Sequence, residues 1–320
     1  MAQTYGKSTN SVIDRALTIK SVFAPYFGDN GYKFNGDNAI TVLSFDNGTL
    51  SGYNEGSLKP APITLVGTTG NDYTLGYNQA MFARIQKTLL QDTPIADGVA
   101  KWARQQIEEV FIPIHDVYSI GKVVAGRQAG QVSRVNVANY GTSNSDRLPV
   151  ALSKALALIK NKGADVSRSV ALLSSTFAVY LADQITFTGS DAGYSDAKNN
   201  SFLGRLYGVT CVEVPDNYFP YVQGSTAGKY VRVQGVVADK RAVLNVAPKM
   251  SPEDFTVIEK VSGFSGPEVQ LRDRGDTFVL EKKKWAIATI EDALANEVTA
   301  ASTAAPAYTT ATTATAVTQL

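Results

Sequence analysis

The stretch EEVFIPIHDVY, residues 108–118, holds the only histidine of the chain, His115, with Asp116 beside it and Pro113 two residues before it. The segment HDVYSIGKVVAG, which starts at this histidine, keeps an amphipathic pattern up to Gly126. A proline inside a helix removes one backbone donor and crowds the preceding turn. We therefore expect a long helix that bends at Pro113 and continues as a shorter helix.

The residues before this proline carry the strongest helical signal of the chain. Asp92 or Thr93 can cap a helix, and Pro94 suits a first helical turn. Residues 94–112 would form a rod of about 28 Å at roughly 1.5 Å per residue. The apolar positions that recur at helical spacing are Ile95, Val99, Trp102, Ile107, Val110 and Phe111.

His115 with Asp116 is the strongest catalytic candidate, because an imidazole beside a carboxylate is the usual basis of general-base chemistry. Neighbouring residues of a helix point about 100° apart, so Asp116 is poorly placed to orient the ring. The chain has no second histidine to share a metal. We expect no catalytic, metal-binding or cofactor-binding residue and interpret His115 as a partly buried or interface side chain. A hydrolase that uses His115 remains an alternative.

The composition argues against several classes of protein. Thirty Lys and Arg residues against 29 Asp and Glu leave a formal charge of +1, which does not suit a dedicated nucleic-acid binder or a polybasic membrane-surface protein. No run reaches the length of a membrane span, and the N-terminus lacks the apolar core of a signal peptide, so we expect a cytosolic protein without membrane contact. Cys211 lies in the apolar run GVTCVEV, which predicts a buried, inert thiol.

Helical and strand patterns alternate after residue 147. LPVALSKALALIKNKG, residues 148–163, predicts a helix with Gly163 past its end. SVALLSS at 169–175 predicts a buried strand, TFAVYLADQI at 176–185 a helix, and YGVTCVEVP at 207–215 a strand. The apolar stripe expected on the first helix consists of Leu148, Leu152, Leu156 and Ile159. This alternation predicts an α+β domain.

The last third of the chain predicts mainly strands. KYVRVQGVVADKRAVLNVA, residues 229–247, returns towards the body of the protein. Strands are expected in FTVIEKV at 255–261, PEVQLRD at 267–273 and DTFVLEKKKWAIATI at 276–290, with Gly-rich connections that suit hairpins. We interpret the charged run 281–284 as an exposed turn between strands.

Both ends of the chain are polar extensions. Residues 1–31 predict an extended arm with a short helix around VIDRALTIKSVFAPYF, closed by Pro25 and a turn at Gly28–Gly31. Residues 298–320 carry no charged side chain and are nearly all Thr and Ala, so an ordered tail would need a surface to lie on.

Residues 32–78 predict a long hairpin that projects from the body. The β-type runs AITVLSF and PITLVG alternate with turn clusters, one of them at Gly67–Gly70. The segment is too poor in apolar residues for a core of its own, and an isolated two-stranded ribbon is marginal in water. We therefore expect another subunit to support it.

The order of these parts resembles the major capsid protein of tailed bacteriophages, a fold shared with encapsulin shells. VFIPIHDVY at 110–118 is similar to the VIPEIDAY-like end of the long helix in that family, with His115 near a position that is often acidic. Asp276, Phe278, Val279 and Leu280 fit the family's D-x-FVL motif, which a short basic turn and an apolar strand follow. The resemblance covers most of residues 32–292.

The resemblance implies an α+β fold with an N-arm, an extended loop, a peripheral domain with a long spine helix, and an axial domain. It divides the chain into an arm at 1–31, a loop hairpin and its return at 32–91, the spine helix at 92–130, an axial domain at 131–248, peripheral strands at 249–292 and a Thr/Ala-rich tail at 293–320. The tail has no counterpart in the family pattern.

By resemblance the protein is a structural subunit and not an enzyme. It would assemble with itself into hexamers and pentamers of an icosahedral shell in the host cytoplasm and enclose double-stranded DNA, which it contacts non-specifically. A separate scaffolding protein and a portal protein are expected partners, with or without a decoration protein. The expected interface residues are Phe45, Asn47, Tyr53, Lys59, Trp102, Arg104, Glu108, His115, Tyr194 and Tyr308.

Two further alternatives stay open. An encapsulin-type shell around a cargo enzyme has the same fold, although the long arm and the long loop disfavour it. A surface or adhesin-like protein would use the Thr/Ala tail as a stalk, but the chain shows no signal peptide.

Overall fold

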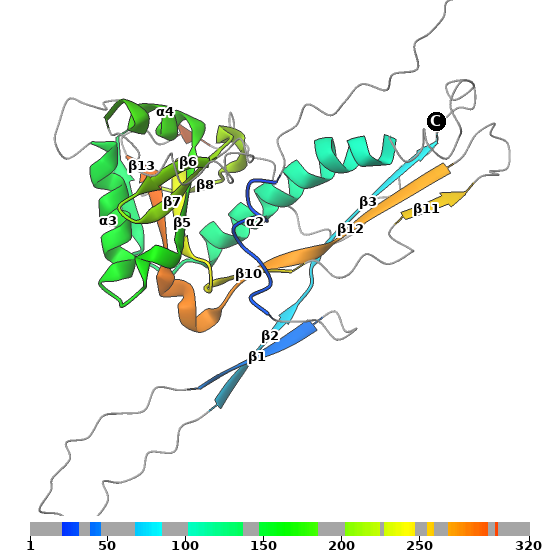
Figure 1. The fold of residues 1–320 in the computed structure, drawn as a ribbon, viewed down its shortest axis with the longest axis horizontal. Coiled ribbons are helices and arrows are strands. Elements are labelled where there is room, and N and C mark those ends of the chain that lie inside the picture. The colour runs from blue at the N-terminus through cyan, green and yellow to red at the C-terminus, as the bar shows by residue number, and fades with distance from the viewer. Residues whose placement is uncertain are drawn as a thin grey trace, which may run out of the picture.

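The computed structural model describes residues 21–31, 39–45, 68–84, 102–136, 147–184, 202–224, 227–246, 255–258, 268–293 and 298–299. Figure 1 shows a mixed helix and sheet body at one end, a long helix and a long strand that run side by side to the other end, and a two-stranded hairpin that points away from both.

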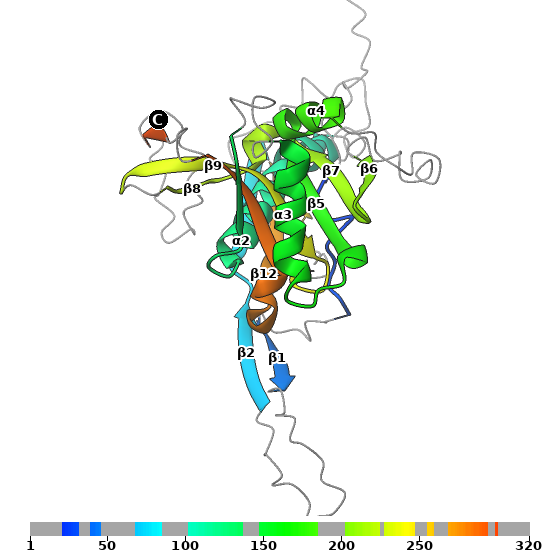
Figure 2. The ribbon, with the colours of Figure 1, turned by 90° about the vertical axis from the view of Figure 1, so that its left-hand side faces the viewer.

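The body is built on an eight-stranded sheet. Its strands run in the order β4 (Val132–Val135), β13 (Ile287–Asp292), β9 (Lys229–Asp239), β5 (Ser169–Ser174), β7 (Val209–Val214) and β6 (Phe202–Leu206), while β8 (Tyr221–Gln223) and β14 (Val298–Thr299) also pair with β9. β5 is parallel to β7 and antiparallel to β9. Figure 2 shows β8 and the adjoining part of β9 extending beyond the body as a ribbon.

Each face of this sheet has its own core. Ala171 and Leu173 of β5 pack with α3 (Leu148–Lys160) and α4 (Ser175–Gln184), whereas Val170 and Leu172 pack with α2 (Ile112–Gly126) and the N-terminal residues. Alternate side chains of a strand point to opposite faces. A strand that is covered on both faces therefore reads as a continuous apolar run, and β5 is buried along its whole length.

Several predictions for this region are confirmed. The helix expected after residue 147 is α3, and all four residues of its apolar stripe are buried. Gly163 lies past its end with a positive φ of 92°, a backbone conformation that glycine adopts easily. The strand expected at 169–175 is β5, the helix expected at 176–185 is α4, and the strand expected at 207–215 is β7.

The chain remains helical across Pro113, but its irregularity lies one turn earlier than expected. Residues 102–106 are helical, Ile107–Phe111 form a π-helical turn (η2), and α2 begins at Ile112 with Pro113 in its first turn. The Ile112 N–H donates to the carbonyl of Ile107, five residues back. A wider turn relieves the crowding that a proline imposes on the turn before it. Residues 92–101 lie outside the described residues.

A second sheet lies along this helix. Its central strand is β12 (Glu268–Val279), which pairs with β10 (Val243–Val246), β11 (Phe255–Ile258) and β3 (Tyr77–Arg84). Val269 and Leu271 pack under the helix with Ala103 and Phe111. Figure 1 shows the helix running alongside β12 for most of its length.

Two predictions for the last third of the chain are wrong. PEVQLRD and DTFVL form one strand, because Gly275 pairs with Tyr77 instead of turning the chain. The hairpin expected between FVL and WAIATI is absent from the described residues: η8 (Glu281–Ala286), a 3-10 helix, carries the chain from β12 to β13 in the other sheet. β13 is buried from Ile287 to Glu291, so it requires cover on both faces, which the edge of a hairpin does not provide.

The projecting hairpin is present with a shifted second strand. β1 (Ala39–Phe45) pairs antiparallel with β2 (Thr68–Thr74), from Ala39 opposite Thr74 to Phe45 opposite Thr68. Residues 67–70 were expected to turn, but Thr68–Gly70 belong to β2, because cross-strand pairing outweighs the weak turn preference of Gly and Thr. The strand expected at 62–67 lies outside the described residues.

The N-terminal segment packs more tightly than an arm would. Residues 21–31 form turns and no helix, consistent with Pro25 in their middle, and Asn30 and Gly31 have positive φ in the expected closing turn. Phe23 and Phe27 stack with ring centroids 4.7 Å apart and are fully buried in the core of the large sheet. The expectation of a helix is therefore wrong for residues 21–27, and the remainder of the predicted arm, residues 1–20, lies outside the described residues.

Candidate assembly interface

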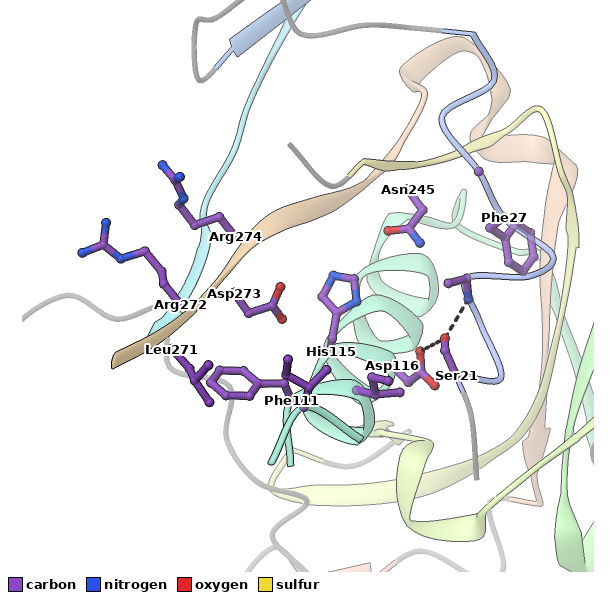
Figure 3. Close-up of a pocket in the computed structure, with 14 residues that line it drawn as sticks. Ser21, Phe27, Phe111, His115, Asp116, Asn245, Leu271, Arg272, Asp273 and Arg274 are labelled. Atoms are coloured by element: carbon purple, nitrogen blue, oxygen red, sulfur yellow. Dashed lines mark hydrogen bonds between the residues drawn. The ribbon is translucent and has the colours of Figure 1, made fainter. Parts of the chain in front are cut away.

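Asp116 is an anchor for the N-terminal segment. Its side chain is 2% exposed and accepts hydrogen bonds from Ser21 Oγ at 2.7 Å and from the Val22 N–H at 2.8 Å. Figure 3 shows Asp116 and His115 leaving the helix in different directions, with the carboxylate turned to Ser21. Burial raises the pKa of Asp116, while the Ser21 and Val22 hydrogen bonds and the nearby His115 act in the opposite direction.

His115 is a partly buried side chain, as expected. Its ring lies edge-on to the Tyr77 ring with centroids 5.0 Å apart, and it lines a pocket next to the N-terminal segment. The arrangement gives the imidazole a packing role between the helix and β3. In the described ranges no three Cys, His, Asp or Glu side chains gather as they would around a metal ion.

A second buried carboxylate, Asp276, joins three elements where the hairpin leaves the body. Tyr118 Oη donates to Oδ1 at 2.9 Å, the Gly76 N–H donates to Oδ2 at 2.8 Å, and the Thr277 N–H donates to Oδ1 at 2.8 Å. Burial, and then the charge of Asp276, raises the pKa of Tyr118, so this phenol stays a donor. The connection between β2 and β3 is therefore tied to the spine helix and to β12.

The hairpin itself contacts the body only near its base among the described residues. Tyr73 packs its ring against Phe278, with centroids 5.3 Å apart, and its hydroxyl accepts from the Glu281 N–H at 3.0 Å. Leu43, further out on β1, is 67% exposed. Figures 1 and 2 both show β1 and β2 pointing away from the body.

The far end of the spine helix is held by a buried carboxylate that pairs with two partly exposed arginines. Glu291 on β13 is 1% exposed and lies 2.6 Å from Arg127 and 3.7 Å from Arg134. Breaking a buried pair leaves an uncompensated charge, so this contact holds the two parts of the fold in one orientation.

Large apolar side chains are exposed at widely separated places. Leu43 lies on the hairpin, Phe82 on β3 is 64% exposed, Val179 on α4 is 60% exposed, and Tyr207 at the β6–β7 turn is 54% exposed. Single exposed apolar side chains are common on protein surfaces, so these four residues do not by themselves define a contact. Sequence reasoning did not identify them, because exposure depends on the tertiary fold.

The structure describes five of the ten expected interface residues. Phe45 ends β1, Arg104 and Glu108 are exposed on the helix, and His115 is partly buried. Trp102 packs against the small core that contains Val269 and Leu271. The other five, Asn47, Tyr53, Lys59, Tyr194 and Tyr308, lie outside the described residues, so the interface remains a prediction.

Asp116 and Asp276 are structural anchors that the sequence did not reveal. Asp116 was considered only as a partner of His115, and Asp276 only as part of a motif. Their partners lie 95 and 158 residues away along the chain, as for Ser21 and Tyr118, so no local pattern reveals them.

Cys211 is buried, and burial raises the pKa of its thiol to about 12. The prediction of a buried, inert thiol agrees with this environment. None of the helices in the described part of the chain is both long enough and apolar enough to span a membrane.

A spine helix, a large sheet covered on both faces, a second sheet along the helix and a projecting hairpin together define a class of fold. It is the fold of tailed-phage capsid proteins, and the expected α+β capsid-type fold is confirmed. No protein-family model and no curated protein sequence matches the chain.

The likeness is to particular solved capsids. The capsid of Ralstonia phage GP4 superimposes with a TM-score of 0.61 at 11% identity, over 91% of this chain and 98% of that one. The capsid of the cyanophage P-SCSP1u superimposes with a TM-score of 0.60 at 12% identity, over 92% of this chain and 93% of that one. The mature capsid of bacteriophage PhiM1 superimposes with a TM-score of 0.57 at 12% identity, over 91% of each chain.

Proposed function

We propose that this protein is the structural subunit of an icosahedral phage capsid. The observation that carries the proposal is the extent of the match: solved phage capsid chains share the fold along 91–92% of this chain and 91–98% of their own. The shared fold therefore covers most of this chain and most of each of these capsid chains.

The projecting hairpin supports assembly with other copies. Two strands that leave the body with Leu43 exposed are marginal on their own in water. A neighbouring subunit can cover them, and obligate interfaces commonly bury on the order of 2,000–5,000 Å². Residues 32–91 would supply this loop and its return, and the expected interface residues on the helix, Trp102, Arg104, Glu108 and His115, would lie near the contact.

The same proposal assigns the remaining parts of the chain. Residues 131–248 would be the axial domain that gathers in hexamers and pentamers, and 92–130 with 249–292 the peripheral domain. Residues 1–31 would be the N-terminal arm, of which residues 21–31 pack on the core of their own chain, and the tail at 293–320 would extend to neighbours. The shell would form in the host cytoplasm with a scaffolding protein and a portal, with or without a decoration protein outside.

The contents of the shell would be double-stranded DNA. A formal charge of +1 allows packed DNA to lie against the wall without strong binding, because phosphate affinity grows with the number of basic contacts. An encapsulin-type shell with a protein cargo is the second candidate within this fold, favoured only by the shared architecture.

The test is negative-stain electron microscopy of the chain expressed alone and with its neighbouring genes. Closed shells, tubes or rings of uniform size are expected in at least one condition. A monodisperse monomer in both conditions would contradict the proposal. Nuclease-protected DNA in purified shells separates the virion from the encapsulin alternative, in which a protein cargo would be found.

We propose no enzymatic activity. His115 packs on Tyr77 and Asp116 binds the N-terminal segment, so the two residues most suited to acid–base chemistry are engaged in structure. The variant His115→Ala should still form particles with normal yield, and loss of a measurable hydrolytic activity in that variant would overturn this proposal.

A further inference from the structure

A pocket separates the N-terminal segment from the second sheet. Its volume is about 590 Å³. Ser21 and Phe27 lie on one side, Arg272 and Arg274 on the other, and Phe111 and His115 of the helix form the floor between them, as Figure 3 shows. We call this space the arm pocket. Its lining is mostly apolar, so in water it favours an apolar occupant.

The preceding part of the chain enters at the rim of the arm pocket. The Ser21 and Val22 hydrogen bonds to Asp116 fix that point, and both Ser21 and Asp116 line the pocket. Consecutive Cα atoms lie about 3.8 Å apart, so Lys20 must start beside the pocket whatever path the chain then takes.

The ten residues before Ser21 have suitable chemistry for this pocket. SVIDRALTIK, residues 11–20, contains Val12, Ile13, Ala16 and Leu17, whose spacing places them on one face of a helical turn. The remaining side chains include Asp14 and Lys20, and the wall of the pocket carries both signs of charge in Arg272, Asp273 and Arg274. Apolar side chains can therefore enter while charged ones stay at the rim.

We propose that residues 11–20 dock in the arm pocket of their own chain. Attachment at Ser21 gives the segment a high effective concentration at the pocket, in the millimolar range for a short flexible connection. A second copy of the segment would have to compete against that advantage. The docked segment covers the partly exposed Ile112 and His115 of the helix, which line the pocket. This inference does not depend on the proposed capsid function.

The test uses pairs of introduced cysteines, since the native Cys211 is buried. Leu17→Cys with Arg272→Cys places one thiol on the segment and one on the exposed wall of the arm pocket. The control pair combines Leu17→Cys with Lys154→Cys, an exposed position on α3. A short bismaleimide is applied to the soluble chain, and the products are identified by gel mobility and peptide mass spectrometry.

An intramolecular crosslink in the Arg272 pair, and not in the Lys154 pair, is the expected result. A ladder of crosslinked oligomers would place another copy in the pocket and would overturn the proposal. Equal crosslinking in both pairs, or none in either, would show that the segment has no fixed place and would also overturn it.

A second measurement does not depend on cysteine reactivity. Trypsin can cleave after Arg15 and Lys20. If the segment is docked most of the time, Ile13→Ser with Leu17→Ser should raise the cleavage rate at these sites by about tenfold or more, because cleavage follows the undocked population. Cleavage that is equally fast in the unaltered chain would contradict docking.

Discussion

At the scale of single residues, two buried carboxylates decide how the chain is held together. Asp116 accepts hydrogen bonds from the N-terminal segment, and Asp276 accepts them from the helix and from the residue just before β3. The donors that bind these carboxylates lose their contact with water when the chain folds. Without the carboxylates they would have no hydrogen-bond partner, which is costly in a protein core.

Replacing the Asp116 carboxylate tests its role as an anchor. Asp116→Asn keeps the shape but presents an amide to donors at Ser21 and Val22, so we expect a loss of about 1.5–3 kcal/mol in the free energy of unfolding. Urea denaturation of the unassembled chain measures it. Asp165→Asn, which alters an exposed carboxylate with a local hydrogen bond, should leave the midpoint unchanged. An unchanged midpoint for both variants would exclude the anchoring role.

The pH dependence of this effect has a defined sign. Burial raises the pKa of Asp116 above 3.8, so the folded protein holds this proton more tightly than the unfolded chain does. Its contribution to stability is then largest at low pH and decreases as pH rises through the folded pKa. The stability advantage over Asp116→Asn should therefore grow from about pH 7 to about pH 4, measured in a His115→Gln background to remove the imidazole titration. A shrinking advantage would mean that the hydrogen bonds outweigh burial.

Cys211 offers a direct test of the core of the large sheet. With its thiol pKa raised to about 12 and its side chain buried, it should react with a soluble disulfide reagent at least about a hundredfold more slowly in the folded chain than in urea. Rapid labelling of the folded chain would contradict the packing of β7 described above.

At the scale of elements, the spine helix is positioned by one close approach. A Cβ at Gly126 would lie 2.5 Å from Val279 Cγ2, closer than side-chain atoms can approach without a shift of the helix or of β12. Gly121, five residues earlier on the same helix, has open space around its Cβ position. Substitution of Gly126 therefore tests the contact with β12, whereas substitution of Gly121 tests the helix propensity alone.

We expect opposite effects of alanine at these glycines. Gly126→Ala should lower the free energy of unfolding by about 1–3 kcal/mol through overpacking. Gly121→Ala should raise it by about 0.5–1 kcal/mol, because alanine loses less backbone entropy in a helix. Thermal or urea unfolding compares the two. The same sign for both variants would mean that the helix does not approach β12 as closely as described.

The hairpin is the element on which the proposed assembly depends most directly. Leu43 is 67% exposed, so Leu43→Asp should leave the unfolding of the unassembled chain unchanged while preventing particle formation. Sedimentation velocity measures the assembled fraction. Leu43→Met, which keeps an apolar side chain, is the matched control and should assemble normally. Normal assembly of Leu43→Asp would exclude this position from the subunit contact.

At the scale of the whole molecule, local patterns predicted the elements better than their connections. The leucine stripe of α3 and the apolar run of β5 were correctly identified, because periodicity follows burial directly. The prediction of a hairpin between β12 and β13 was wrong. Strand pairing between distant segments depends on which faces of each strand must be covered, and the local sequence does not state this. The order of short motifs nevertheless pointed to the correct fold.

The candidate interface was harder to predict from the sequence than the helices and strands were. Trp102 packs on the core that contains Val269 and Leu271 and is only partly buried, so its place at a subunit contact stays a prediction. An amphipathic pattern does not state which partner covers the apolar face. The exposed Phe82 and Leu43 carry no local signal that distinguishes them from core residues. Buried anchors such as Asp116 depend on contacts far away along the chain.

The most direct test of the central claim is a cryo-electron microscopy reconstruction of particles formed by this chain with its neighbouring genes. We expect a closed icosahedral shell of rings of five and six, in which the hairpin β1–β2 of each copy contacts an adjacent copy. A protein that stays monomeric, or particles in which the hairpin extends into solvent without a neighbour, would contradict the proposed function.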